Sequence, residues 1–387
     1  MNRRDYEMAG KSYRELNGLD CMKSLAAMQQ GKSSGSASGG KGGGGSRHRE
    51  RLFLGLATSL SLGQRPLTLS LSLLSTFHSS SLAIDDIVDG SETRRGAPAA
   101  WQRLGIGAAM TGAYLAVLDA VHTTAGGFRR WREETRLLLV AALVDAHAGQ
   151  AEELDWRPDG TDGPLLEPPS DERLRIVAAR KTGVAFLLMA DVIEMHLRPW
   201  WAEWLPVPAA SWVPAHLREP SQRSLAVSAG AVLVAIVDML APLTGSLSRA
   251  SWISLRNLLG DLGVFFQRRD DYVNVASPPY WDSHGFCDDL HERKMTWLIA
   301  HAVTDEKSRA VLTSLWTAPE ATHTLVAAAH RALQLDGTLT WAAASLNAEH
   351  ADLTARASRY PPVAEALGRL TIPPPCLDDC SAWTPSS

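Results

Sequence analysis

Residues 85–95 read Asp-Asp-Ile-Val-Asp-Gly-Ser-Glu-Thr-Arg-Arg, and they follow directly on an uncharged run from Leu67 to Ile84. On a helix, Asp85 and Asp89 lie four positions apart and project from one face, with Asp86 beside them. Like charges this close raise one another's pKa unless a cation lies among them. Hard oxygen ligands that leave room for water and phosphate oxygens suit Mg²⁺ better than zinc. The stretch therefore predicts a metal and diphosphate site at the end of an apolar helix, and a solvated acidic helix end is the alternative.

A second acidic pair favours the metal site over the solvated helix end. Asp270 and Asp271 lie within residues 262–274, where another apolar helical segment runs into paired carboxylates. Two such helices that face each other would hold several Mg²⁺ ions between them and clamp one diphosphate. Arg94 and Arg95 close the first stretch, and guanidinium groups bind phosphate oxygens through paired hydrogen bonds.

With both acidic motifs in place, the chain resembles the trans-isoprenyl diphosphate synthases, most closely the fungal geranylgeranyl diphosphate synthases. Further segments match motifs of that family in the family's order. They are Gly10-Lys11-Ser12-Tyr13-Arg14 (GKxxR), His78 to Gly96 (histidine, first aspartate-rich motif and RRG), Gly149-Gln150 with Trp156-Arg157 (GQxxDxYWR), Lys181-Thr182-Gly183 (KTG), Phe266 to Asn274 (FQxRDDYxN) and Asp289 to Lys294 (DLxEGK).

The resemblance implies an all-α fold, a single large helical bundle of the isoprenoid synthase type. Its active-site cavity would lie between the helices that carry the two aspartate-rich motifs. The composition agrees, because alanine and leucine are frequent, apolar stretches are long and no segment alternates as a half-buried strand would.

The resemblance also implies a reaction, the head-to-tail condensation of isopentenyl diphosphate with an allylic diphosphate (dimethylallyl, geranyl or farnesyl). The barrier to this trans-prenyltransferase reaction is charge separation, so catalysis is mostly electrostatic help to the departing diphosphate. Three Mg²⁺ ions per active site would lie among the motif carboxylates, which are Asp85, Asp86, Asp89, Asp270 and Asp271.

The remaining site residues carry over from the same motifs. The expected ligands of the allylic diphosphate are Arg94, Lys181 and Lys294, those of isopentenyl diphosphate are Lys11, Arg14, His78 and Arg95, and the neighbours of the same site are Thr182 and Gln267. Several have ordinary alternatives. Lys181 at a loop-to-helix junction would by itself be read as a solvated charge, and His78 as a core histidine. Lys11 and Arg14 would be surface charges, Gln150 a helix-interface residue and Tyr272 a packing residue.

Product length depends on side chains that block the apolar tunnel below the first motif. Ser81 and Ser80, four and five positions before Asp85, are small and leave the tunnel open, while Phe77 is the alternative floor. We expect geranylgeranyl diphosphate for terpenoid biosynthesis first, farnesyl diphosphate second and a longer product third. A role in fungal specialised metabolism and a homodimer are further expectations.

Length, charge and composition limit the classes of protein to which the chain can belong. The 387 residues are 45% hydrophobic and can bury a large core. A net charge of −4 argues against a nucleic-acid partner. Leu225 to Val237 is too short to cross a membrane and Leu67 to Ile84 contains six serines, so we expect buried helices, no transmembrane segment and a cytoplasmic protein. The cysteines lack a zinc spacing, and Cys376 and Cys380 are expected to be reduced and incidental.

Composition also divides the chain. The expected parts are an N-terminal helical segment (1–31), a Gly/Ser-rich linker (32–50), the helical core (51–370) with a Trp- and Pro-rich inserted loop (198–221), and a C-terminal tail (371–387).

Four residues depart from the family's motifs. His284 stands where a lysine is usual, Arg293 where a glycine is usual, Glu153 replaces an aspartate and Asn274 replaces the third carboxylate of the second motif. These changes keep two other classes open. One is a non-catalytic partner subunit of a prenyl synthase, and the other is a class I terpene cyclase, which would need an NDxxSxxxE-like segment instead of the second aspartate pair.

Overall fold

The computed structural model describes residues 48–94, 97–127, 132–157, 168–197 and 249–378, with Cys380 and Trp383. Within these ranges the chain is almost entirely helical, which confirms the all-α prediction. Strands are limited to one antiparallel ladder between β1 (Thr93–Arg94) and β2 (Ala97–Pro98). Lys11, Arg14, Arg95, the Gly/Ser-rich linker up to residue 47 and the inserted loop 198–221 lie outside the described residues.

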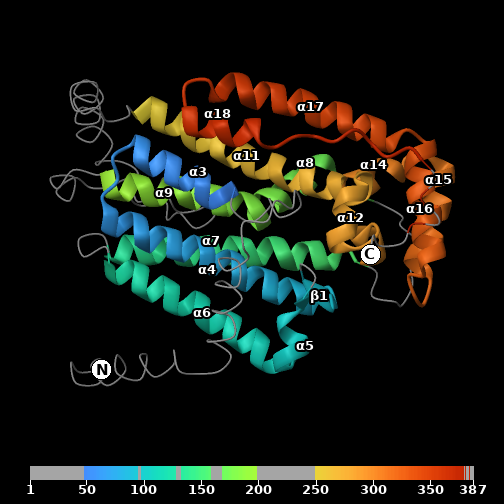
Figure 1. The fold of residues 1–387 in the computed structure, drawn as a ribbon, viewed down its shortest axis with the longest axis horizontal. Helices are drawn as coiled ribbons and strands as arrows, with labels where there is room; N and C mark the ends of the chain where they lie inside the picture. The colour runs from blue at the N-terminus through green and yellow to red at the C-terminus, as the bar shows by residue number, and fades with distance from the viewer. Residues whose placement is uncertain are drawn as a thin grey trace, which may run out of the picture.

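Figure 1 shows the helices as one bundle in which the longest members run along a common direction. The bounds of the helices in the first half are α3 (His48–Ser59), α4 (Gln64–Val88), α5 (Ala100–Leu104), α6 (Ile106–Gly127), α7 (Arg132–Asp155), α8 (Asp171–Ala178) and α9 (Val184–Leu197). Those in the second half are α11 (Arg249–Ala276), α12 (Pro278–His284), α13 (Asp288–His291), α14 (Trp297–Ala302), α15 (Glu306–Thr317), α16 (His323–Leu335), α17 (Thr338–Ala357) and α18 (Pro361–Gly368).

Helix α11 is the centre of this bundle. In Figure 1 it passes between α17 and α18 on one side and α9 on the other, while α15 and α16 stand across one end. Its apolar residues Leu255, Leu258, Leu262 and Phe265 recur every third or fourth position, and each is at most 1% exposed. A helix buried this deeply can hold the second acidic motif in a fixed position.

Helix α4 carries the first acidic motif at its C-terminal end. Leu67, Leu73 and Leu74 are buried, and the helix packs along α6. Among the described residues α4 is the only helix whose length and composition would allow it to cross a membrane. It packs along α6 within the bundle and ends in charged residues.

The KTG segment differs from its prediction. It lies inside a continuous helical run, α8 to α9, in which Ala179–Gly183 form a single π turn. Lys181 is therefore not at a loop-to-helix junction. A π turn widens the helix by one residue, and such turns often occur at functional sites.

Two glycines allow the backbones of neighbouring helices to approach this π turn closely. A Cβ on Gly149 of α7 would lie 2.8 Å from Arg180 Cβ and 2.9 Å from the Lys181 nitrogen. A Cβ on Gly263 of α11 would lie 2.5 Å from Gly183 Cα. At both positions a larger residue would meet backbone atoms of the π turn and would push the helices apart.

The two ends of the predicted core also differ slightly from the composition-based boundaries. Helix α3 begins at His48, inside the range predicted as linker. At the other end, residues 369–378 have no regular structure but run along α11, where Tyr272 Oη donates to the Pro373 carbonyl at 2.8 Å. We refer to residues 369–378 as the C-terminal segment.

Gly263→Ala is expected to lower the free energy of unfolding by roughly 1–3 kcal/mol, because the new methyl group meets backbone that cannot rotate away. Gly107→Ala is the matched control, since nothing lies within 4 Å of its Cβ position. There the free energy should stay the same or rise by up to about 1 kcal/mol. Urea unfolding followed by circular dichroism measures both. Equal stability of the two variants would show that α11 does not depend on this contact.

Candidate active site

A cavity of about 1430 Å³ lies between α3, α4, α7, the π turn, α11 and α13. Residues of both acidic motifs line it. The cavity therefore lies between the two motif helices, where the active site was expected. The carboxylates on its wall are Asp85, Asp89, Glu153, Asp270, Asp271, Asp288, Asp289 and Glu292.

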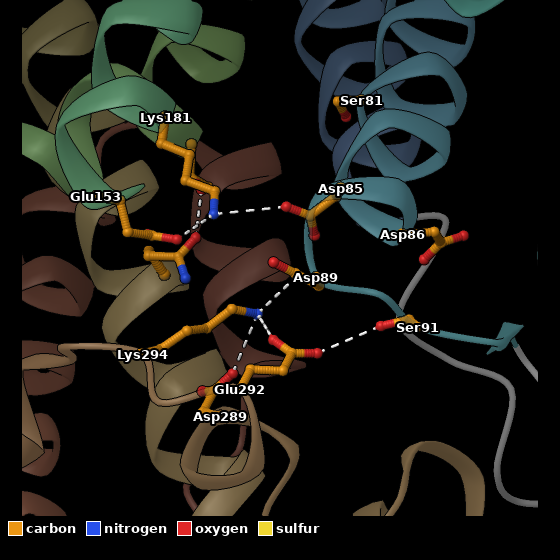
Figure 2. A network of polar contacts seen from close by, with 12 residues as sticks. Ser81, Asp85, Asp86, Asp89, Ser91, Glu153, Lys181, Asp289, Glu292 and Lys294 are labelled. Carbon is orange, nitrogen blue, oxygen red and sulfur yellow. Dashed lines mark hydrogen bonds and ion pairs between the residues drawn. The ribbon is translucent and has the colours of Figure 1, made fainter. Parts of the chain in front are cut away.

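Lys181 lies between α4 and α7 and bonds to both. Its Nζ is 2.8 Å from Glu153 Oε1 and 3.7 Å from Asp85 Oδ1 (Figure 2). Burial by itself would lower the pKa of Lys181, but Glu153 and Asp85 outweigh it and raise that pKa. Lys181 is therefore a partly buried, paired cation at the first motif and not a solvated charge, and its role as a ligand of the allylic diphosphate stays a prediction.

Lys294 has the same role beside Asp89 of the same motif. Its Nζ lies 3.0 Å from Asp89 Oδ2 and 3.5 Å from Asp289 Oδ1, and it also pairs with Glu292 (Figure 2). These acids raise the pKa of Lys294 well above its ordinary value in spite of burial. Lys181 and Lys294 thus face each other across the first motif.

Arg157 completes this network, and the sequence motifs had assigned it no role. Its Nη2 lies 2.7 Å from Asp89 Oδ1 and 3.8 Å from Glu153 Oε1. Burial would raise the pKa of Asp89, but Lys294 and Arg157 lower it. Glu153, in place of the family's aspartate, reaches both Lys181 and Arg157.

Asp86 points away from the two lysines in Figure 2 and is only 3% exposed. Its Oδ1 accepts a hydrogen bond of 2.7 Å from Arg94 Nε, so Asp86 holds the arginine that follows the motif. Burial raises the pKa of Asp86 although Arg94 opposes it. Its predicted role as a metal ligand stays a prediction.

The second motif is tied to the π turn. Thr182 Oγ1 hydrogen-bonds Gln267 Oε1, and Gln267 Nε2 donates to Asp271 Oδ1 at 2.7 Å. Burial, followed by repulsion from Asp289, raises the pKa of Asp271 well above its usual value. The structure therefore brings Thr182, Gln267 and Asp271 together as predicted.

Asn274 has a structural reason to be an amide. Its Oδ1 accepts from the Asp289 backbone N–H at 3.1 Å and fixes the loop that carries Asp289 and Lys294. Arg293, where the family has glycine, stands at φ 56°, a left-handed conformation that favours glycine. Its Nη2 donates to the Ala318 carbonyl at 2.6 Å, a bond that a glycine cannot make. The His284 side chain lies outside the described part.

Another part of the cavity lining is basic. It contains His78, Arg269 of the second acidic motif and four residues that the motifs did not identify, namely His48, Arg49, Arg51 and Arg369. We call this group the basic wall. Burial, followed by repulsion from Arg269, Arg51 and Arg369, lowers the pKa of His48, which indicates an excess of positive charge.

Arg49 is the residue that sequence reasoning missed. Its Nη1 lies 3.0 Å from His78 Nδ1, and its guanidinium stacks 5.3 Å above the Phe266 ring. It adds a cation beside His78. Arg49 stands at the start of α3, directly after the Gly/Ser-rich segment, where a motif search for GKxxR does not find it. The roles of Lys11, Arg14 and Arg95 stay predictions.

Below Asp85 the cavity narrows between apolar and small side chains. Phe77 and Ser81 of α4 line it, whereas Ser80 is 1% exposed and lies outside its lining. Of the two serines predicted to keep the tunnel open, only Ser81 has that position. Gln150 also lines the cavity, and its buried Nε2 has no partner among the described residues. Tyr272 is buried and serves packing, as expected.

The donor chemistry of the acidic side fits a divalent cation. Among the described residues, five carboxylates (Asp85, Asp89, Glu153, Asp289 and Glu292) share the cations Lys181, Lys294 and Arg157. Burial raises the pKa of Asp289 to about 6 and that of Glu292 to about 8, so a cation that binds there would favour their charged forms. In the described part of the chain, no three acidic, His or Cys side chains are arranged as a preformed metal site.

Comparisons with known proteins agree with this arrangement. The sequence profile of the polyprenyl synthetase family matches residues 40–198 and 225–333. Geranylgeranyl pyrophosphate synthase ltmG of Epichloe festucae is 28% identical over 60% of this chain and 51% of its own length. A terpene synthase of Matsumurasca onukii is 25% identical over 60% of this chain and 56% of its own length. The chain thus spans little more than half the length of these relatives.

The fold has close structural counterparts as well. The crystal structure of a polyprenyl synthase from Caulobacter crescentus, complexed with calcium and isoprenyl diphosphate, superposes with a TM-score of 0.60 and 17% identity, covering 92% of this chain and 95% of the other. The fold and the facing acidic motifs define a helical isoprenoid-synthase-type protein. The chain belongs to the polyprenyl synthetase family.

Asp289 and Glu292 are expected to contribute less to the free energy of unfolding of the metal-free chain as pH rises from roughly 4 to 8. Their pKa values are about 6 and about 8 in the fold, against 3.8 and 4.5 ordinarily. In this window the folded chain binds more protons at these two groups than the unfolded chain does, so raising the pH removes their share of the stability. Above pH 8 both states have lost these protons and the dependence ends.

Urea unfolding in EDTA at a series of pH values measures this dependence. Glu292→Gln should flatten the slope between about pH 6 and 8, and Glu320→Gln, an exposed carboxylate, is the control. An unchanged slope in Glu292→Gln would contradict the expectation.

Proposed function

We propose that the chain is a Mg²⁺-dependent trans-prenyltransferase that joins isopentenyl diphosphate head to tail to an allylic diphosphate. One observation carries the proposal: a single cavity has an acidic wall bridged by two lysines and, in the same lining, the basic wall with Arg49 and His78. Two separate sites for anions in one cavity fit a reaction between two diphosphates. Family membership and the relatives named as geranylgeranyl pyrophosphate synthases support it.

The allylic diphosphate would bind at the acidic wall. Mg²⁺ among Asp85, Asp89 and Asp271 would supply the positive charge that stabilises the departing diphosphate. Lys181 and Lys294 are already charged and held at this position by Glu153, Glu292 and their neighbours. Once cations bind the carboxylates, these ammonium groups become available to phosphate oxygens, and their preset orientation lowers the barrier to ionisation.

Isopentenyl diphosphate would bind at the basic wall. Arg49 stacks on Phe266, so its planar guanidinium is oriented before the ligand arrives. His78 lies within hydrogen-bond distance of it, and Arg51 and Arg369 add positive charge nearby. This set would bind isopentenyl diphosphate alongside Lys11 and Arg14, whose roles stay predictions.

Between the two walls the substrates' carbon atoms would meet. The allylic C–O bond breaks, the double bond of isopentenyl diphosphate attacks the cation, and the proton lost from the new chain passes to the departed diphosphate. Gln150 lines the cavity beside this position, and its buried amide nitrogen has no hydrogen-bond partner among the described residues. Apolar side chains, with Phe77 and Leu82 among them, would exclude water from the cation.

A class I terpene cyclase is the second candidate, because one relative is a terpene synthase. A cyclase ionises one diphosphate and has no use for the basic wall. Asp270 and Asp271 also stand where it would need an NDxxSxxxE-like segment. A non-catalytic partner subunit is less favoured, since both acidic motifs and both lysines are present.

The open position of Ser81 favours a twenty-carbon product, geranylgeranyl diphosphate, for use in terpenoid biosynthesis. Farnesyl diphosphate is the alternative if Phe77 forms the floor. The expected homodimer has exposed apolar side chains on α6 and α7 as its candidate surface, including Leu118 at 55% and Leu137 at 70% exposed. Sedimentation equilibrium would decide whether the chain dimerises.

Purified protein incubated with Mg²⁺, isopentenyl diphosphate and each allylic diphosphate in turn should release diphosphate and a longer prenyl diphosphate. Asp85→Asn should lower kcat by roughly 10²-fold or more, because it removes charge where the leaving group departs. Arg49→Gln should raise KM for isopentenyl diphosphate about tenfold or more and leave KM for the allylic substrate nearly unchanged.

Product sizing by mass spectrometry, with circular dichroism as a folding control, measures these effects. Cyclic hydrocarbon from one substrate would favour the cyclase, and no turnover with any substrate would favour the partner subunit. An Arg49→Gln variant that affects both substrates equally would contradict two separate sites.

Ser81→Phe is expected to shorten the main product, because the ring would fill the cavity one turn below Asp85. Phe77→Ala should lengthen it if Phe77 is the floor. Ser81→Ala is the matched control and should leave the product unchanged, since the serine hydroxyl donates only to the His78 carbonyl of its own helix. If Ser81→Phe still makes a twenty-carbon product, the growing chain does not pass Ser81.

A further inference from the structure

The C-terminal segment is anchored along the helix that carries the second acidic motif. Three hydrogen bonds hold it over the last turns of α11. They run from Arg269 Nε to the Thr371 carbonyl at 2.8 Å, from Tyr272 Oη to the Pro373 carbonyl at 2.8 Å and from the Cys376 N–H to the Ala276 carbonyl at 3.0 Å. The segment is therefore part of the folded core and not a loose tail.

A second set of contacts fixes the chain around the two cysteines. Gln334 of α16 donates through Nε2 to the carbonyls of Cys376, at 3.0 Å, and Asp378, at 2.9 Å. The Trp383 N–H donates to the Cys380 carbonyl at 3.0 Å, and the Trp383 ring stacks on Phe286. Both cysteine backbones are thus held from outside the pair.

These contacts place the two sulfurs side by side. Cys376 Sγ lies 3.3 Å from Cys380 Sγ, and both side chains are partly accessible. A disulfide bond is about 2 Å long, so small side-chain rotations would bring these sulfurs to bonding distance. Cys287, the other cysteine in the described part, differs because it is 0% exposed and burial raises its pKa well above the ordinary value.

We propose that Cys376 and Cys380 form a redox-active dithiol, a modification site that small-molecule disulfides such as glutathione disulfide convert to an intramolecular disulfide. One protein thiolate attacks the reagent, its S–S bond breaks and one reagent thiol leaves. The second protein thiolate then attacks the mixed disulfide and expels the other reagent thiol. The protein loses two hydrogens and the reagent gains them, so electrons and protons balance.

The disulfide would close a small loop between residues 376 and 380. This loop begins at Cys376, whose N–H bonds the last residue of α11. Arg369, Leu370, Thr371 and Pro373 of the same segment line the active-site cavity. A covalent link between residues 376 and 380 would therefore stabilise the attachment of the C-terminal segment, which forms part of the cavity wall. We expect hydrogen exchange at the Cys376 amide, which bonds the end of α11, to slow about tenfold after oxidation.

The test treats the native full-length chain with glutathione disulfide, blocks remaining thiols with N-ethylmaleimide and maps the peptides by mass spectrometry. The expected product is a loss of two hydrogens on the peptide that contains both cysteines, with Cys287 unmodified. It should form at least about tenfold faster than in the urea-unfolded chain, because the fold holds the sulfurs together. Hydrogen exchange of the oxidised and reduced chains gives the second measurement.

Cys376→Ser and Cys380→Ser are the matched variants, and each should stop at a mixed disulfide with glutathione on its remaining cysteine. The proposal is overturned if the native chain gives only mixed disulfides, if the cysteines pair with Cys287 or Cys21, or if oxidation is no faster than in the unfolded chain. Unchanged exchange at Cys376 in the oxidised protein would overturn the anchoring role.

Discussion

The close approach of three helix backbones at the π turn Ala179–Gly183 is the constraint on which the site depends. Gly149 of α7 and Gly263 of α11 have no side chain, so both helices come within backbone contact of the turn. The π turn itself rotates Lys181 towards Asp85 and Glu153 while Thr182 reaches Gln267. One local irregularity thereby connects the first acidic motif, on α4, with the second, on α11. The matched Gly149 and KTG motifs therefore have a packing reason as well as a chemical one.

Around this contact the cavity separates charge. On one wall carboxylates outnumber the cations that share them, and on the other wall burial and then repulsion from arginines lower the pKa of His48. Each excess is costly in a folded chain unless a ligand of opposite charge binds there. Divalent cations at one wall and a diphosphate at the other would relieve both, which is why the arrangement fits a two-substrate prenyl transfer better than a reaction of one diphosphate.

The composition of the C-terminal segment does not predict its place in the fold. A Pro-rich stretch with two cysteines reads as a tail, since prolines prevent a helix and supply no N–H for a sheet. In the fold its carbonyls accept hydrogen bonds from Arg269, Tyr272 and Gln334, all of which lie far away in the sequence. Such donors cannot be identified before the helices are packed. The same contacts convert an incidental cysteine pair into a positioned dithiol.

The sequence by itself determined the all-helical class and the two acidic motifs. It also predicted, through its resemblance to the motifs of prenyl synthases, that Lys181, Lys294, His78 and Gln267 belong to one site. The tertiary structure decided which side chains complete that site. Arg49 and Arg157 carry no recognisable spacing to their partners His78 and Asp89, and Ser80 and Ser81 are indistinguishable until the face of α4 towards the cavity is known. The physical reason is that a helix fixes neighbours three or four positions apart, whereas contacts between helices depend on how closely their backbones can approach.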